Sequence, residues 1–208
     1  MPQAVPPSPR KTRIQAQNQE LILDAALEVF SVYGFRGSTV DQIARKCGLS
    51  KPNLLYYFRR KEDIYIAVLE RTLSDWLEPL RALDAGGDPV AELSRYIGVK
   101  IRLSRERPGA SRLFANEILH GATAIGAFLK GPLKELVDAK AAVIAQWIAE
   151  GRLAPVDPYH LIFAIWATTQ HYADFDVQVR AVLGESKDPM KNAEQALLRI
   201  LIDGARRR

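Results

Sequence analysis

Apolar side chains recur every three to four residues along most of this 208-residue chain, and no segment alternates apolar and polar residues as a half-buried strand does. A spacing of three to four residues places these side chains on one face of a helix. From Gln17 to Tyr33 the predicted buried stripe consists of Ile22, Ala25, Ala26, Val29, Phe30 and Tyr33. The pattern predicts an all-α protein.

Residues 39–58, TVDQIARKCGLSKPNLLYYF, predict two short helices joined by a tight turn. Thr39 is an N-cap residue, and Gln42 stands three residues further on, so the two side chains can form a capping box. Gly48 permits the left-handed backbone conformation that ends a helix. Ser50 is predicted to cap the second helix.

The second short helix is predicted to bury Leu54 and Phe58, which are four residues apart and therefore share a face. The outer face then consists of Lys51, Asn53, Leu55, Tyr56 and Tyr57. A positive, amide-bearing and aromatic face on a short second helix suits a reader of the DNA major groove. Taken alone, the same pattern also fits an ordinary helical hairpin in a core.

Proline and glycine divide the rest of the chain. A fourth helix is predicted from Lys61, with Pro79 kinking or ending it. The loop that follows contains Gly86 and Gly87, and Asp157 and Pro158 form an N-cap and first-turn pair. Further helices are predicted over residues 89–105, 110–120, 132–150, 158–183 and 189–205.

The predicted helix that begins at Pro158 is apolar on two sides. One side carries Ile162, Phe163, Trp166, Gln170 and Ala173, and the other carries Leu161, Ile165, Thr168, Tyr172 and Phe175. A helix that is apolar on both sides must be buried on both sides. The body of the same subunit can cover one side, and a partner subunit would cover the other.

Composition limits the class of protein. Hydrophobic residues make up 48% of the chain, but no run of 18 apolar residues exists, so no membrane span or membrane partner is expected. The N-terminus lacks the apolar region of a secretory signal, and the single Cys47 cannot form an internal disulfide, so a cytoplasmic protein is expected. The three histidines lack metal-ligand spacing, and no phosphate loop or nucleophile–base arrangement stands out. We therefore expect no metal, no cofactor and no enzymatic activity.

The net charge of +5 is concentrated near the N-terminus. Residues 1–62 contain ten Lys or Arg against five Asp or Glu, whereas residues 63–208 contain nineteen of each. This distribution indicates a polyanion-binding module attached to a neutral body. Residues 1–14 are rich in proline and basic residues, and predict a disordered arm that either follows the DNA or is simply a flexible tail.

Residues 34–65, GFRGSTVDQIARKCGLSKPNLLYYFRRKEDIY, resemble the DNA-binding domain of the TetR family of transcriptional regulators. The resemblance implies a three-helix helix-turn-helix domain over residues 15–60 and a helical effector-binding and dimerisation domain over residues 61–208. It also implies a ligand-responsive repressor that binds double-stranded DNA. The two reading helices of a homodimer, joined through the last two helices of each protomer, would require an inverted-repeat operator.

The expected DNA contacts lie within and just after the helix-turn-helix segment. The residues that the resemblance assigns to DNA are Thr39, Ser50, Lys51, Asn53, Leu55, Tyr56, Tyr57 and Lys61. Tyr56 and Tyr57 match an aromatic pair that grips the backbone, and Lys61 matches a lysine that clamps a phosphate. Family members often have Tyr where Leu55 stands, so an apolar contact, for example to a thymine methyl, is expected there.

Trp166 and Gln170 lie one turn apart and can line one cavity, which Trp76 could close from the linking helix. A carboxamide donates and accepts, which matches a cyclic amide or imide edge, and indoles stack on flat rings. A hydrogen-bonded glutamine between core tryptophans is the alternative from geometry alone. Asn116 and Tyr172 are further candidate lining residues.

The segments PGASRLF at 108–114 and LAPVDPYHLIFAIWATTQHYADF at 153–175 resemble a member of the same family that senses pyrimidines. That resemblance implies uracil or thymine as effector and a role in pyrimidine and nitrogen metabolism. The alternatives are a sensor of another small planar or lipophilic molecule, such as a regulator of multidrug efflux, and an unregulated architectural DNA binder.

Overall fold

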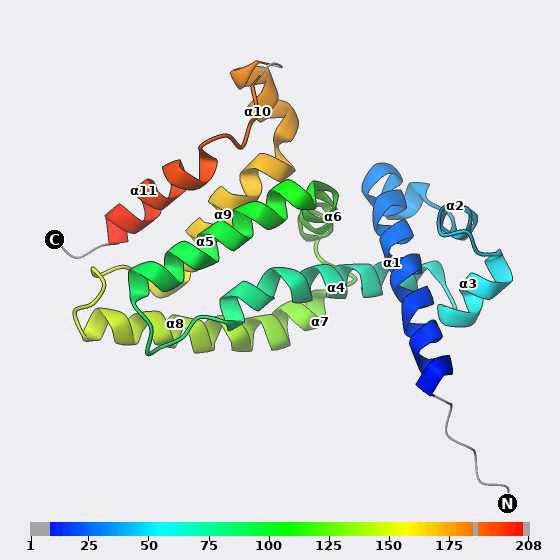
Figure 1. The fold of residues 1–208 in the computed structure, drawn as a ribbon, viewed down its shortest axis with the longest axis horizontal. Helices are drawn as coiled ribbons and strands as arrows, with labels where there is room; N and C mark the ends of the chain where they lie inside the picture. Colours follow the sequence, from blue (N-terminus) through cyan, green and yellow to red (C-terminus); the bar gives the residue numbers. More distant parts are fainter. Residues whose placement is uncertain (1–8, 185–186, 206–208) are drawn as a thin grey trace, which may run out of the picture. The chain divides into compact units, whose positions relative to one another are not determined.

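The computed structural model describes residues 9–184 and 187–205, and every regular element in these ranges is a helix (Figure 1). The all-α prediction is therefore confirmed. The chain forms two compact units, Met1–Arg71 and Thr72–Arg208. Within the N-terminal unit the Arg71 guanidinium pairs with Glu20 and Asp24 at 2.8 and 2.7 Å.

The N-terminal unit contains α1 (Pro9–Gly37), α2 (Val40–Lys46), α3 (Lys51–Tyr57) and the first half of α4 (Lys61–Arg81). Helix α1 begins eight residues before the predicted Gln17, so it overlaps the predicted arm, whose residues 1–8 lie outside the described ranges. Proline is well tolerated in the first turn of a helix, because its missing N–H has no intrahelical partner there. At the other end, Gly34 leaves helical geometry with a φ of 66°.

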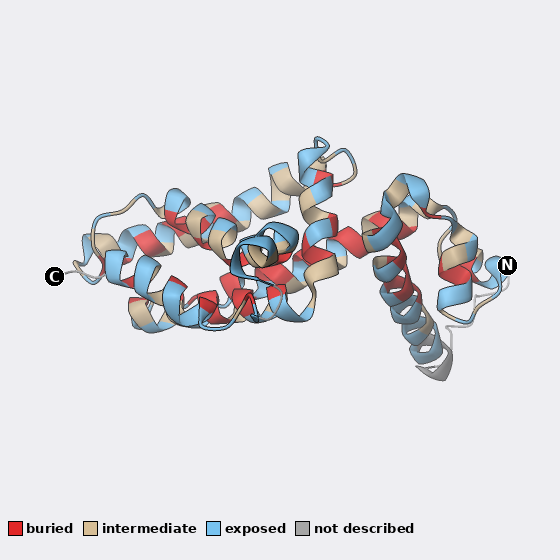
Figure 2. Ribbon diagram, turned by 90° about the horizontal axis from the view of Figure 1, so that it is seen from above, coloured by how far each residue is buried: buried red, intermediate tan, exposed pale blue. Residues whose placement is uncertain are grey.

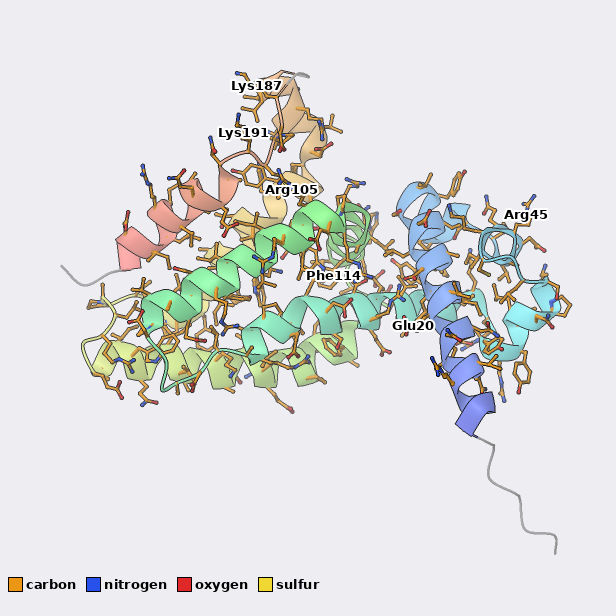
Figure 3. All side chains as sticks on the ribbon, in the orientation of Figure 1. Glu20, Arg45, Arg105, Phe114, Lys187 and Lys191 are labelled. Atoms are coloured by element: carbon orange, nitrogen blue, oxygen red, sulfur yellow. The ribbon has the colours of Figure 1, made fainter. Side chains whose placement is uncertain are left out.

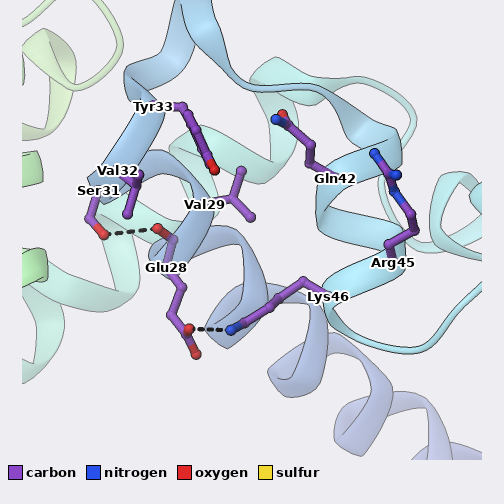
Figure 4. A pocket seen from close by; sticks show the side chains of 8 residues that line it. All are labelled: Glu28, Val29, Ser31, Val32, Tyr33, Gln42, Arg45 and Lys46. Carbon is purple, nitrogen blue, oxygen red and sulfur yellow. Dashed lines mark hydrogen bonds and ion pairs between the residues drawn. The ribbon is translucent and has the colours of Figure 1, made fainter.

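The buried stripe of α1 is confirmed except at one position. Ile22, Ala26 and Phe30 are at most 1% exposed, but Tyr33 is 55% exposed. Tyr33 lines an open groove of about 630 Å³ between α1 and α2 (Figure 4). The predicted burial of Tyr33 is therefore wrong.

The C-terminal unit begins with the second half of α4. Its helices are α5 (Pro89–Glu106), α6 (Pro108–Leu119), α7 (Gly126–Phe128), α8 (Lys134–Ala149), α9 (Pro158–Asp174), α10 (Asp176–Leu183) and α11 (Ala193–Ala205). Helix α9 packs against α5, α6, α8 and α11 and is the centre of this unit. Pro79 lies inside α4, within three residues of its end.

Several boundaries in this unit differ from prediction, and α11 begins at Ala193 instead of residue 189. A π-helical turn, η1 (Leu129–Leu133), precedes α8, because Pro132 cannot donate the backbone hydrogen bond of a regular helix. The helix predicted from Pro158 to Leu183 is interrupted at Phe175, whose φ of −115° and ψ of 31° separate α9 from α10. No glycine or proline marks that break in the sequence.

The core of the C-terminal unit is formed by the inner faces of α5, α8, α9 and α11. Figure 2 marks the buried positions of the chain in red. Trp147 of α8 is fully buried, and its indole N–H donates to the Ala85 carbonyl at 2.9 Å. Asp157 caps α9 as predicted, since its carboxylate accepts from the His160 N–H at 3.0 Å. None of the described helices is long and apolar enough to cross a membrane.

Candidate functional site

The helix-turn-helix has the predicted caps. The Gln42 N–H donates to Thr39 Oγ1 at 3.2 Å, and the Thr39 N–H donates to Gln42 Oε1 at 2.7 Å, which completes the capping box. Ser50 Oγ accepts from the Asn53 N–H at 3.3 Å. Gly48 takes a φ of 71°, which L residues with a side chain rarely adopt. Local capping therefore fixes where α2 and α3 begin.

Helix α3 presents the predicted outer face. Lys51 and Asn53 are exposed and Tyr56 is 75% exposed, while Leu54 on the opposite side is fully buried. Leu55 is half-buried, which suits the apolar contact expected of it.

Tyr57 and Lys51 of α3 interact with side chains outside this helix. The Asn18 side chain donates to Tyr57 Oη at 2.7 Å, and the Tyr56 and Tyr57 rings meet edge to face at 5.3 Å. Lys51 Nζ pairs with Asp41 at 2.8 Å, and this hydrogen bond lowers the pKa of the Asp41 carboxyl.

Lys61 has a structural role that the sequence did not reveal. Its ammonium donates to the Phe35 carbonyl at 2.7 Å and to the Ser38 carbonyl at 2.8 Å, and it lies 4.5 Å from the centroid of the Phe35 ring. These contacts connect the first turn of α4 to the end of α1 and to the residues before α2. Of its three N–H donors, one remains for a phosphate.

A second candidate site is a cavity in the C-terminal unit with a volume of about 40 Å³. Helices α4, α5, α6 and α9 and the π-helical turn all contribute to its walls; Phe114 from α6 is labelled in Figure 3. The lining residues are Thr72, Leu73, Trp76, Leu77, Lys100, Phe114, Leu133, Trp166 and Gln170.

The polar groups of this cavity are few. The Trp166 N–H donates to Tyr96 Oη at 2.6 Å, and burial raises the pKa of Tyr96. Lys100 Nζ donates to Gln170 Oε1 at 3.3 Å and lies 4.0 Å from the centroid of the Trp76 ring. The indole N–H of Trp76 is buried and has no hydrogen-bond partner among the described residues.

Lys100 is 2% exposed, and burial lowers its pKa to about 7, an effect that the nearby carboxylate of Asp174 opposes. Desolvation disfavours the charged form of a buried lysine, and an opposite charge favours it. Asp174 is itself partly buried. Burial raises the pKa of its carboxyl, and the hydrogen bond from Ser111 lowers it. The cavity thus contains a cation close to its deprotonation point at neutral pH.

Three of the predicted effector residues, Trp76, Trp166 and Gln170, line this one cavity. The other two do not. Asn116 is exposed, and its backbone carbonyl accepts from the His120 N–H. Tyr172 packs partly buried against the helical core and meets the His171 ring at 6.1 Å, because its position on α9 points away from the cavity.

Sequence reasoning missed Lys100 and Phe114 as lining residues. A signal for Lys100 was present, since it lies four residues after Tyr96 and seven after Leu93, on the buried stripe of α5. A lysine on an apolar stripe is unusual, because lysine is almost never fully buried without a partner.

Two family models and a curated relative match nearly the whole chain. The model described as bacterial regulatory proteins, tetR family, matches residues 22–68, and the model described as YcdC-like protein, C-terminal region, matches residues 69–208. The HTH-type transcriptional regulator RutR of Escherichia coli strain K12 is 47% identical over 208 residues, which cover 99% of this chain and 98% of RutR.

Solved structures share the fold. The putative transcriptional regulator SCO4942 from Streptomyces coelicolor has a TM-score of 0.68 at 27% identity, covering 90% of this chain and 98% of its own. AibR, solved in complex with isovaleryl coenzyme A and operator DNA, has a TM-score of 0.66 at 18% identity, covering 88% and 97%. On these family matches and the helix-turn-helix geometry, the chain belongs to the TetR family of DNA-binding transcriptional regulators.

Proposed function

We propose that this protein is a homodimeric, cytoplasmic repressor that binds an inverted-repeat operator and releases it when uracil or thymine binds in the cavity of the C-terminal unit. The observation that carries the proposal is the convergence of two indoles and a carboxamide, Trp76, Trp166 and Gln170, on one cavity. As a member of its family the protein is a transcriptional regulator and not an enzyme.

On the DNA side, the proposed base-reading residues are Lys51, Asn53 and Leu55 on α3. The proposed backbone contacts are Thr39, Ser50, Tyr56, Tyr57 and Lys61. Lys51 must leave Asp41 to reach a phosphate or a base, so the bond between them competes with DNA. The excess of positive charge in residues 1–62 supports this assignment, since phosphate contacts dominate affinity.

A homodimer is supported by apolar side chains that a single chain leaves uncovered. Phe163 of α9, Val177 and Val182 of α10, and Ile200 of α11 are between 48% and 84% exposed. Exposed large apolar groups that gather on neighbouring helices mark interaction surfaces. A twofold dimer would present two copies of α3 to successive turns of the operator.

On the effector side, a pyrimidine base fits the chemistry of the cavity walls. Indoles favour flat rings, and the Gln170 carboxamide matches a cyclic amide. A volume of 40 Å³ holds only a few water molecules, so binding a six-membered ring requires the walls to separate. Helix α4 carries Trp76 and, about four turns earlier, Lys61, so a shift of this helix would link the cavity to the DNA-binding residues.

Control of the operator requires that the pyrimidine bind two conformers with different affinities. A second candidate function is the sensing of a lipophilic molecule, which Leu73, Leu77 and Leu133 in the cavity wall favour. Gln170 and Lys100 in the same wall would have only each other as hydrogen-bond partners against such a ligand, which is unfavourable because most of their polar groups would stay unpaired.

The test is calorimetric titration of the purified protein with uracil and with thymine, followed by operator release. We expect saturable binding at about one ligand per subunit and loss of operator binding at the same ligand concentrations. Absence of heat and of any thermal shift at millimolar uracil and thymine would remove the pyrimidines as effectors and leave the DNA-binding regulator in place.

A further inference from the structure

The cavity of the C-terminal unit contains two buried groups, Lys100 and Trp76, whose hydrogen-bond donors are largely unused. Lys100 is buried, and its ammonium has three N–H donors but one hydrogen bond among the described residues, to Gln170 Oε1 at 3.3 Å. Trp76 is 5% exposed, and its indole N–H has no partner among the same residues. A buried donor without an acceptor loses its hydration and gains nothing in return.

The two indoles of the cavity are therefore not equivalent. Trp166 has already used its N–H on Tyr96 Oη at 2.6 Å, so only its ring can meet a ligand. Trp76 has one ring face beside the Lys100 ammonium at 4.0 Å, while its N–H is unused. The geometry favours stacking on Trp166 and donation from the edge of Trp76.

Gln170 supplies an acceptor beside these donors. Its Oε1 lies beside Lys100 Nζ, so a donor and an acceptor stand next to each other on α5 and α9. With the Trp76 N–H from α4, the Lys100 ammonium and Gln170 Oε1 form a set of two donors and one acceptor on three different helices, and the Thr72 hydroxyl also lines the cavity. Its complement is a ligand edge that presents a carbonyl oxygen, an N–H and a second carbonyl oxygen.

We propose that Lys100, together with the N–H of Trp76 and Oε1 of Gln170, selects planar rings that carry a cyclic imide and rejects rings in which an amino group replaces one of the oxygens. The inference rests on the proposed pyrimidine effector and makes Lys100 the specificity-determining residue of that site. An amino group would place a donor against a donor, and the unmatched polar groups of a closed site strongly disfavour such a ligand.

The position of Lys100 supports this role over a purely structural one. Its partners are Gln170 Oε1 at 3.3 Å, the face of the Trp76 ring and the charge of Asp174, and burial lowers its pKa to about 7. A ligand carbonyl would give the ammonium the oxygen that its surroundings lack. Binding would also draw the ammonium from the Trp76 ring, which opens space in the cavity.

The experiment compares uracil with cytosine, which has the same ring but an amino group in place of one oxygen. Calorimetry is performed on the full chain, on Lys100→Met, which keeps the stem and removes the donors, and on Trp76→Phe, which keeps an aromatic ring and removes the N–H. Arg102→Met is the matched control, since Arg102 is an exposed cation on the same helix α5. Thermal unfolding of each variant checks that it folds.

We expect the unaltered protein to bind uracil at least about tenfold more tightly than cytosine. Lys100→Met should weaken uracil binding by about tenfold to a hundredfold and reduce the preference over cytosine, since it removes a charge-assisted hydrogen bond. Trp76→Phe should weaken uracil binding by about threefold to tenfold. Arg102→Met should change neither affinity.

Equal binding of uracil and cytosine by the unaltered protein would overturn the inference while leaving the pyrimidine effector in place. Unchanged uracil affinity and preference in a folded Lys100→Met variant would do the same. If that variant does not fold, the ligand preference of the unaltered protein and the Trp76→Phe titration decide the matter. Failure of the unaltered protein to bind any pyrimidine would remove the proposed effector and this inference together.

Discussion

Replacing Lys61 by methionine should destabilise the protein even without DNA, because the ammonium connects the first turn of α4 to two backbone carbonyls. The bonds to Phe35 O and Ser38 O are 2.7 and 2.8 Å long, and the ammonium lies 4.5 Å from the Phe35 ring centroid. Hydrogen bonds from a charged donor contribute up to about 3 kcal/mol each when buried. Lys61 is only half-buried, so water compensates part of the loss. We expect the free energy of unfolding to fall by about 1–3 kcal/mol in total.

The assay is urea denaturation followed by far-ultraviolet circular dichroism, together with operator binding by the same variant. The control is Lys46→Met, which breaks a surface ion pair to Glu28 whose side chains are 50% and 63% exposed. Such a pair contributes at most about 1 kcal/mol, and commonly less. A Lys61→Met variant that unfolds at the same urea concentration as the parent but binds the operator poorly would refute the reasoning. Lys61 would then act at the DNA alone.

Three further predictions concern single groups. Tyr56→Ala should weaken operator binding by about tenfold across sequences, as measured by gel shift. It should not lower the unfolding temperature in a thermal melt, because the Tyr56 side chain is 75% exposed. Gln170→Ala should abolish operator release by uracil while retaining DNA binding, and a retained response would remove Gln170 from the site. Uracil affinity should decline as the pH rises above about 7, because burial lowers the pKa of Lys100 to about 7 and the charged ammonium donates the proposed hydrogen bond to uracil. The carboxylate of Asp174 on α9 opposes this lowering of the Lys100 pKa. Calorimetry between pH 6 and 8 should show this decline in the parent and a flat profile in Lys100→Met.

The DNA-binding unit could be predicted closely because its signals are local. Thr39 and Gln42 are three residues apart, and so are Ser50 and Asn53, so each cap is formed within a single helical turn. The unexpected contact in this unit is that of Lys61, whose partners Phe35 and Ser38 lie more than twenty residues away in sequence. Helix periodicity contains no information about which carbonyls a distant turn will leave unsatisfied.

The lining of the cavity could be predicted only where its residues are close in sequence. Trp166 and Gln170 lie one turn apart on α9, so helical spacing alone places them together. Lys100 is seventy residues from Gln170, and only the packing of α5 against α9 brings them into contact. Tyr172, a further candidate on the same helix, is not among the lining residues, because its position on the wheel faces the other side of α9.

The distribution of tryptophan gives the protein an intrinsic optical reporter. Of the three tryptophans in the chain, Trp76 and Trp166 line the cavity, and Trp147 is fully buried with its N–H held by the Ala85 carbonyl. A ligand entering the cavity would change the emission of the first two indoles and leave the third as a constant background. Fluorescence of the unlabelled protein should therefore follow effector binding in real time, and the variants Trp76→Phe and Trp166→Phe would show which indole the ligand reaches first.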